Sequence, residues 1–353
     1  MPLTTYHFRV KDATTRGHLL RLASSVNFVW NYCNEVSSRS IEYNNKWLCG
    51  FDLDKLTNGC SKDLGLHSQT IQAITKEYAT RRRQFKKKKL AWRSTKRSLG
   101  WIPFKADGIS VHGDQIVYSG KVFRFWKSRD IEGKIQTGSF CQNKQGRWYV
   151  NLTCRVEKKI SRTPTNQYVG VDLGLKTTAT YSDGSKFEGG RHYRQLEESL
   201  GKAQRAGKKK RVKKIAARIA NRRKDELHKE TSRLVNNYDK IFIGDVSSMK
   251  MVKTKTAKSA LDAGWGMYRS MLAYKAIRLG VEVYDTNEKF STVTCSACSA
   301  RSGPGGLSGL GVRQWVCRAC GASHDRDVNA AINILAAGLG HQTLTKGISR
   351  LQA

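Results

Sequence analysis

The spacing of hydrophobic residues predicts that the chain opens with one strand followed by helices. Residues 3–10 (LTTYHFRV) alternate and are rich in β-branched and aromatic side chains, which is typical of a strand. From residue 14 to about residue 43, apolar residues recur at three- and four-residue steps, which indicates a helix. A second helical pattern places Ile71, Ile74 and Tyr78 on one face and runs into a basic segment.

Between Leu99 and Lys159 the pattern changes to short alternating strands. Turn signals such as Asp107-Gly108 separate segments that include QIVYSG, VFRFW and RWYVNLTCRV. Strands at this spacing predict a small antiparallel barrel. Because the strand at residues 3–10 has no β-neighbour nearby in sequence, we expect it to join this barrel, with the helical part inserted between.

The second half of the chain predicts a mixed sheet covered by helices. After a linker at residues 161–166, an apolar strand ends on Asp172, and a hairpin turn follows at Asp183-Gly184. A long basic helical segment, the strand KIFIGDV, a helix stopped by Gly280, the strand VEVYD and an Ala-rich helix come next. A hairpin followed by alternating strands and helices is typical of a mixed sheet with helices packed on it.

Two Cys-x-x-Cys pairs near the C-terminus predict a metal site. Eighteen residues separate Cys295 and Cys298 from Cys317 and Cys320, a spacing that suits four thiolates around one zinc ion. Two disulfides are the alternative, but we expect a reduced compartment, because no signal peptide is recognisable and the other five cysteines are scattered singly. Four thiolates leave no open coordination position, so the zinc is expected to be structural.

The charge balance predicts a polyanionic partner. The 353 residues contain 64 Lys and Arg against 28 Asp and Glu, a net charge of +36, which exceeds what solubility needs. Such an excess repels itself unless a polyanion neutralises it, so nucleic acid is the expected partner. A solvated basic face on an unrelated protein is the alternative. No apolar run approaches the length of a membrane span, so no membrane association is expected.

Two basic segments are the candidate nucleic-acid contacts. The first interleaves cations with aromatic residues, which suits phosphates together with stacked bases. The second lies on a predicted helix with one apolar stripe, so its cations cover the remaining surface. In both segments a solvated helix is the alternative. The candidates are Arg81, Arg82, Arg83, Lys86, Lys87, Lys88, Trp92 and Arg93 in the first segment and Lys208, Lys209, Lys210 and Arg211 in the second.

Two aspartates are candidate metal ligands. Asp172 ends a strand and Asp327 opens the last helix, and each alone could be only a turn former or a helix cap. In a chain this basic, such carboxylates also suit hard divalent cations, which take oxygen ligands. Two Mg²⁺ ions held by three or four carboxylates would clamp the attacking and leaving oxygens of a phosphodiester, and this requires a third acid.

Taken together, these motifs resemble a known family. GVDLG, the strand ending IGDV, the CSAC and CRAC knuckles and HDRDVNAAINIL are similar to the RuvC-type nuclease core of the TnpB proteins of insertion sequences, relatives of Fanzor proteins and type V CRISPR effectors. The matching motifs span about residues 168–338, and RSTKRSLGWIPFK is also similar. The resemblance implies an RNA-guided, Mg²⁺-dependent DNA endonuclease with a transposon-encoded guide RNA, which cleaves double-stranded DNA next to a short motif.

The resemblance also implies an α+β fold of several domains. Its RuvC-like domain has the RNase H fold, and we expect a monomer in the prokaryotic cytoplasm with the nucleoid, or in the nucleus of a eukaryote. The expected parts are a wedge β-barrel at 1–12 and 90–161, a helical recognition insert at 13–89, the RuvC-like domain at 162–288 and 326–340, a zinc ribbon for target nucleic acid at 289–325, and a tail at 341–353.

The third acid departs from the family pattern. The resemblance places Asp172 and Asp327 on the two catalytic aspartates. Where the family usually has glutamate, however, this chain has Gly244, which carries no ligand. Asp245 follows directly, but side chains alternate along a strand, so it should face away from the site.

Glu288 is expected to replace the missing glutamate in the catalytic and Mg²⁺-binding set. It lies just beyond the VEVYD strand, and neighbouring strands are about 5 Å apart, so its carboxylate can reach the same metal. Fanzor proteins and one TnpB branch resemble this chain in having a glutamate at about this position. Asp285 is the alternative third ligand. A nuclease-inactive RNA-guided repressor and a DNA transposase remain the alternative functions.

Overall fold

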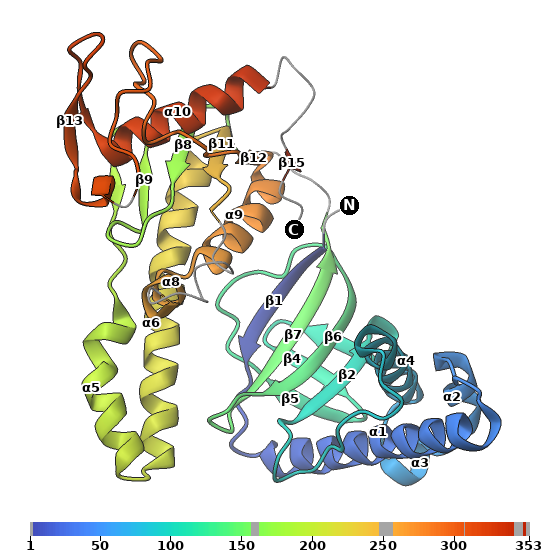
Figure 1. The fold of residues 1–353 in the computed structure, drawn as a ribbon. Coiled ribbons are helices and arrows are strands. Elements are labelled where there is room, and N and C mark those ends of the chain that lie inside the picture. Colours follow the sequence, from blue (N-terminus) through green and yellow to red (C-terminus); the bar gives the residue numbers. More distant parts are fainter. Residues whose placement is uncertain (1–2, 157–161, 247–256, 307, 342–348, 351–353) are drawn as a thin grey trace. The chain divides into compact units, whose positions relative to one another are not determined.

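The computed structural model describes residues 3–156, 162–246, 257–306, 308–341 and 349–350, and it divides the chain into two compact units (Figure 1). The units comprise residues 1–157 and 158–353. The predicted tail at 341–353 lies mostly outside the described residues. Among the described helices, every one is too short or too polar to span a lipid bilayer.

The first unit contains two antiparallel sheets. One has the strand order β1-β7-β6-β2 and the other β3-β4-β5, and a bridge between Val10 and Phe125 links them. β1 pairs with β7 from Leu3↔Arg155 to Arg9↔Tyr149, which confirms that the first strand joins the strands that follow the helices. The strands are β1 (Leu3–Arg9), β2 (Trp101–Lys105), β3 (Ile109–His112), β4 (Gln115–Tyr118), β5 (Lys121–Arg124), β6 (Lys134–Gln142) and β7 (Trp148–Arg155).

Four helices stand between β1 and β2 in the sequence, as the periodicity predicts for the two long ones. They are α1 (Arg16–Asn44), α2 (Gly50–Leu56), α3 (Ser61–Leu64) and α4 (Ser68–Phe85). Leu22, Ile74 and Tyr78 belong to the same hydrophobic core as the strand residues, so the helices and sheets form one unit. α4 ends at Phe85, because Lys86 has a left-handed φ of 50°.

The second unit is built on the predicted mixed sheet. Its strand order is β10-β9-β8-β11-β12-β15, in which β8, β11 and β12 run parallel and the other pairs antiparallel. The strands are β8 (Tyr168–Asp172), β9 (Ala179–Tyr181), β10 (Lys186–Phe187), β11 (Lys240–Gly244), β12 (Glu282–Thr286) and β15 (Ser349–Arg350). The helices are α5 (His192–Arg205), α6 (Lys209–Asn237), α8 (Ala257–Ala263), α9 (Trp265–Leu279) and α10 (Arg326–His341).

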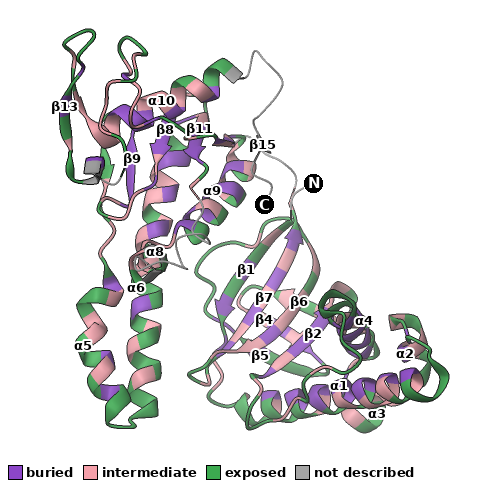
Figure 2. Ribbon diagram, viewed as in Figure 1, coloured by how far each residue is buried: buried purple, intermediate pink, exposed green. Residues whose placement is uncertain are grey.

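The two faces of this sheet are covered by different helices (Figures 1 and 2). Val169, Ile241 and Val283 pack in one core with residues of α6 and α9. Side chains alternate along strands, so the intervening positions face α10. Gly170 shows this directly, since a β-carbon there would clash with the carbonyl oxygen of Ala331 in α10. Asp172 stands two residues after Gly170 in the same strand, so its side chain lies on the same face of the sheet, toward α10.

Candidate active site

The three predicted carboxylates come from three separate elements of the second unit. Asp172 is the last residue of β8, Glu288 follows β12 by two residues, and Asp327 lies in the first turn of α10. Burial, followed by the charges of Glu288 and then Asp327, raises the pKa of Asp172 to about 7. β8 and β12 each pair in parallel with β11, so their carboxyl ends, with Asp172 and the segment leading to Glu288, lie at the same edge of the sheet.

Glu288 lies over Gly244. A β-carbon at position 244 would clash with the Oε2 of Glu288 and would lie 3.3 Å from its Cβ. The Glu288 side chain therefore fills the space into which a side chain on residue 244 would point. Burial and then the charge of Asp245 raise the pKa of Glu288. Asp245 also accepts a hydrogen bond from the backbone N–H of Glu288 at 3.2 Å, which anchors the start of this loop.

Asp285 belongs to the opposite face of the sheet. It is in register with Ile243, which packs in the core formed with α6 and α9. Its carboxylate forms an ion pair with Arg269 of α9, and Arg269 also donates to the carbonyl oxygen of Gly244. The guanidinium of Arg269 thus already neutralises the Asp285 carboxylate on that face. Glu288 is therefore the better candidate for the third ligand.

At the start of α10, Asp325 caps the helix and Asp327 does not. The Oδ1 of Asp325 accepts hydrogen bonds from the backbone N–H groups of Asp327 at 3.0 Å and Val328 at 3.1 Å, so Asp325 caps the helix. The carboxylate of Asp327 instead accepts two hydrogen bonds from Nη1 of Arg313, at 2.9 and 2.8 Å. Asp327 is therefore not the cap, and its oxygens face a cation.

The carboxylates suit a hard divalent cation. Among the described residues, the four cysteines form the group whose ligand atoms all lie within 4.8 Å of one another. The acids offer only oxygen ligands, and their mutual repulsion is what a divalent cation would relieve. This donor set therefore fits Mg²⁺ better than a softer metal.

We expect the protein to lose stability in magnesium-free buffer as the pH rises through about 7. The folded pKa of Asp172 is raised above its ordinary value, so its contribution to stability is complete below about pH 4 and is lost as the pH passes the folded value. The largest effect is about 4 kcal/mol. Urea unfolding at several pH values measures it, and Asp172→Asn should flatten the profile; an equally steep profile in that variant would contradict the assignment.

The four cysteines have the dimensions of a tetrahedral thiolate site. The sulfur atoms of Cys295 and Cys320 lie 3.7 Å apart, and those of Cys298 and Cys317 lie 3.6 Å apart. Four sulfurs at about 2.3 Å from a zinc ion would be separated by about 3.8 Å. All nine cysteines are free, so the disulfide alternative is not adopted. The second pair lies in the turn that connects β13 (Gln314–Val316) and β14 (Ser323–Asp325), which pair as a hairpin.

Two asparagines of α10 join the cysteine cluster to the acids. The Nδ2 groups of Asn329 and Asn333 both donate to the carbonyl oxygens of Ser291 and Thr294, at 2.7 to 3.2 Å. The Oδ1 of Asn329 accepts from the N–H of Ser296 at 2.9 Å. The segment from Glu288 to the first knuckle is thereby fixed onto the helix that carries Asp327.

Most of the predicted nucleic-acid contacts are exposed, but Arg82 is not. Arg81, Arg83, Lys86, Lys87 and Lys88 are exposed, Trp92 is 52% exposed, and Lys208 to Arg211 are exposed at the start of α6. Arg82 is only 3% exposed, donates to the carbonyl oxygen of Leu48, and stacks on Trp47. Its prediction as a phosphate contact is therefore wrong in this structure. Arg93 is half-buried, and its guanidinium carbon lies 5.7 Å from the ring centroid of Trp30 and 5.7 Å from that of Trp101.

Arg82→Ala should destabilise the first unit by about 2 kcal/mol, because it leaves a buried carbonyl without its partner. Arg83→Ala is the matched control one residue away: it should change stability by less than about 0.5 kcal/mol and should weaken nucleic-acid binding. Urea unfolding and salt-dependent binding to a DNA duplex measure the two effects. Equal stability losses in both variants would contradict the structural role of Arg82.

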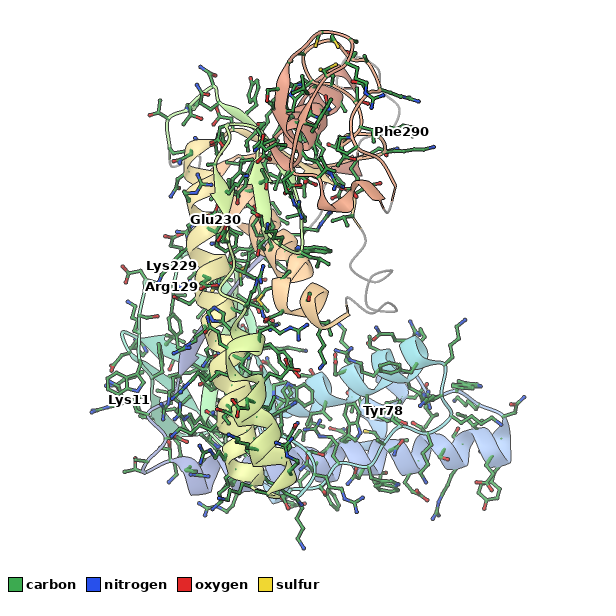
Figure 3. All side chains as sticks on the ribbon, turned by 60° about the vertical axis from the view of Figure 1, so that its left-hand side comes forward. Lys11, Tyr78, Arg129, Lys229, Glu230 and Phe290 are labelled. Carbon is green, nitrogen blue, oxygen red and sulfur yellow. The ribbon has the colours of Figure 1, made fainter. Side chains whose placement is uncertain are left out.

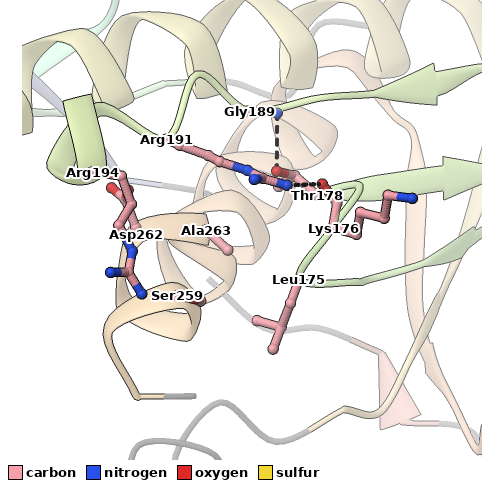
Figure 4. A pocket seen from close by; sticks show the side chains of 9 residues that line it. All are labelled: Leu175, Lys176, Thr178, Gly189, Arg191, Arg194, Ser259, Asp262 and Ala263. Atoms are coloured by element: carbon pink, nitrogen blue, oxygen red, sulfur yellow. Dashed lines mark hydrogen bonds between the residues drawn. The ribbon is translucent and has the colours of Figure 1, made fainter. Parts of the chain in front are cut away.

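A cavity of about 460 Å³ lies beyond the end of β8 (Figure 4). Lys176, Arg191 and Arg194 line it, and Nη2 of Arg191 donates to the carbonyl oxygen of Lys176 at 3.1 Å. The one acid among the lining residues, Asp262, is engaged by Arg223 at 2.8 Å. The cavity is thus cationic, and it extends from the loop that follows Asp172.

Comparison with known proteins identifies the group to which the chain is related. A family model described as "Probable transposase" (OrfB_IS605) matches residues 151–255, and one described as "Cas12f1-like, TNB domain" matches residues 265–334. A "TnpB-like protein" of Acanthamoeba polyphaga mimivirus is 38% identical over 136 residues, which cover 36% of this chain and 25% of that protein. Over this segment the chain is similar to TnpB proteins.

Two further likenesses cover more of the chain. A Streptomyces pristinaespiralis protein named "Putative RNA-guided DNA endonuclease" is 39% identical over 227 residues, which cover 60% of this chain and 55% of that protein. The chain thus spans about half the length of this relative. A Cas12f1 chain solved by cryo-EM with sgRNA and target DNA has a TM-score of 0.62 at 13% identity, covering 91% of this chain and 82% of that one. This likeness shows a shared fold.

Three residues around the carboxylates were not found from the sequence. Arg313 is one cation among 64 Lys and Arg, and no pattern marks it as the partner of Asp327. Asn329 and Asn333 are visible in the sequence at a helical four-residue spacing. Their carbonyl partners, however, lie 35 to 42 residues earlier in the chain, so their role required the fold.

Proposed function

We propose that this chain is an RNA-guided, Mg²⁺-dependent DNA endonuclease of an insertion sequence, which cleaves double-stranded DNA next to a short motif. The observation that carries the proposal is the Glu288 carboxylate, which fills the space above Gly244 and raises the pKa of Asp172. If the third acid had simply been lost, no acidic side chain would be expected in the space over Gly244. The nuclease-inactive repressor is therefore the less favoured alternative.

The roles of the residues follow from their positions. Asp172, Glu288 and Asp327 would hold two magnesium ions, which supply the Lewis-acid chemistry of phosphodiester hydrolysis when bound. Arg313 orients Asp327 through its two hydrogen bonds and adds positive charge where a phosphate would enter. The four cysteines would hold structural zinc, which fixes the segment that begins at Glu288.

The partners follow from charge and from the relatives. A transposon-encoded guide RNA and a double-stranded DNA target would neutralise the net charge of +36, and base pairing would supply the sequence choice. We further propose that the two sheets of the first unit form the wedge barrel, that the second unit has the RuvC-like RNase H fold with a zinc ribbon, and that a monomer acts in the prokaryotic cytoplasm.

The test begins with the RNA that purifies with the full-length protein from cells carrying its insertion sequence. After that RNA is sequenced, its guide segment is replaced and the complex is incubated with a matching plasmid and Mg²⁺. The expected result is cleavage that follows the new guide and is lost in Asp172→Asn. Guide-dependent binding without cleavage would support the repressor, and joining of transposon ends to target DNA would support a transposase.

A further inference from the structure

Phe290, two residues beyond Glu288, has a strained backbone and an exposed ring. Its φ is 68°, in the left-handed region that residues with a β-carbon rarely adopt. Its ring is nevertheless 43% exposed, so burial of the ring does not offset the strain. Figure 3 labels it on the part of the second unit that carries the cysteine knuckles. A single exposed phenyl is common, but a strained one requires a reason.

The surrounding hydrogen bonds impose this conformation. The carbonyl oxygen of Phe290 accepts from the N–H groups of Val293 at 3.1 Å and Thr294 at 3.0 Å. The next carbonyl along, that of Ser291, is held by the asparagine pair of α10. Strain of this kind persists only where the surroundings enforce it, and it is concentrated at functional sites.

Two cations lie over the ring. The guanidinium carbon of Arg301 lies 4.1 Å from the ring centroid, and the Nζ of Lys289 lies 5.0 Å from it. Arg301 and Lys289 are both exposed. An aromatic ring with flanking cations matches an unpaired nucleotide, whose base stacks while its phosphate pairs with the cations. A purely apolar partner would leave both cations without a counter-charge.

We propose that Phe290, Lys289 and Arg301 form a stacking platform that binds an unpaired base of a nucleic-acid strand beside the carboxylates. Its placement next to the cleaved phosphate rests on the proposed function, whereas base stacking itself does not. DNA and RNA share the necessary chemistry, a base with a phosphodiester. The strain is explained because the loop presents the ring outward instead of burying it.

The first experiment measures stacking without cleavage. Single-stranded DNA and RNA oligonucleotides carrying 2-aminopurine are titrated with the full-length, zinc-loaded protein in magnesium-free buffer, where stacking quenches the fluorescence. Phe290→Ala should weaken binding roughly tenfold and abolish the quenching, as should Phe290→Leu, whereas Phe290→Tyr should retain both. The oligonucleotide that is quenched more strongly identifies the natural strand. Unchanged affinity and quenching in Phe290→Ala would overturn the proposal.

A matched control and a stability measurement complete the test. Phe51 is also exposed and also lies near a cation, 4.7 Å from the Nζ of Lys55, but it belongs to α2. Phe51→Ala should leave the quenching unchanged, and an equal loss would overturn the proposal.

Phe290→Gly should raise the melting temperature while it weakens binding, because glycine removes the strain. A lower melting temperature would show that the ring is structural. If no variant cuts DNA but the quenching still depends on Phe290, the proposed function fails and the platform remains.

Discussion

Glu288→Gln should reduce guide-directed DNA cleavage about 1000-fold while leaving the fold and DNA binding intact. The glutamine keeps the size of the side chain over Gly244, but it cannot supply the negative charge that holds a second divalent cation. A loss of about 4 kcal/mol in transition-state stabilisation corresponds to this factor. Single-turnover cleavage of a matched DNA fragment measures it, with target binding followed in parallel.

Asp285→Asn is the matched control three residues away. Its carboxylate pairs with Arg269 on the other face of the sheet, so the substitution should affect stability more than the rate of cleavage. If Asp285→Asn removes cleavage and Glu288→Gln does not, the third ligand is Asp285. If both variants cut normally, the site does not require a third carboxylate from this part of the chain.

Moving the carboxylate between the two positions gives a sharper test of the same geometry. Gly244→Glu alone should be inactive or unstable, because its β-carbon would overlap the Glu288 carboxylate and approach within 3.1 Å of the Ile334 side chain. Combining Gly244→Glu with Glu288→Ala removes the overlap and returns the acid to β11. Recovery of cleavage in the double variant, relative to Glu288→Ala, would show that the two positions serve one site.

The places of Asp172 and Asp327 in the fold could be predicted from the sequence, because local structure sets them. Asp172 ends an apolar strand and Asp327 opens a helix, and both features are readable without the fold. The replacement of the missing acid by Glu288 was inferred from the resemblance. The overlap with Gly244 adds a physical reason, since two parallel neighbouring strands bring their carboxyl ends together.

Arg82 shows where composition misled the prediction. It stands in a run of basic residues and was therefore assigned to phosphate binding. The helical pattern of Ile71, Ile74 and Tyr78, continued by four residues, places it on the buried face. Periodicity should have outweighed charge at that position. The strain at Phe290 could not be predicted in the same way, because the segment that contains it is held in part by hydrogen bonds from α10, which lies some forty residues further along the chain.

Cys298→Ser should remove the metal and unfold the knuckles, with a second large loss of activity. Structural zinc contributes roughly 10–16 kcal/mol in small zinc modules, comparable to or greater than the roughly 5–15 kcal/mol that stabilises a whole domain. The segment held by Asn329 and Asn333 leads from Glu288 to Cys295, so loosening the cluster should also loosen the third carboxylate. The zinc content, the melting temperature and the cleavage rate should all fall together.

Cys49→Ser is the matched control for this zinc prediction. Cys49 is an exposed free thiol at the start of α2, and serine is well suited to that helix-capping position, so zinc content, stability and cleavage should be unchanged. A Cys298→Ser protein that retains one zinc per chain would contradict the four-cysteine site. One that loses zinc but still cuts at the normal rate would show that Glu288 is positioned by the asparagine pair of α10 alone, without help from the metal.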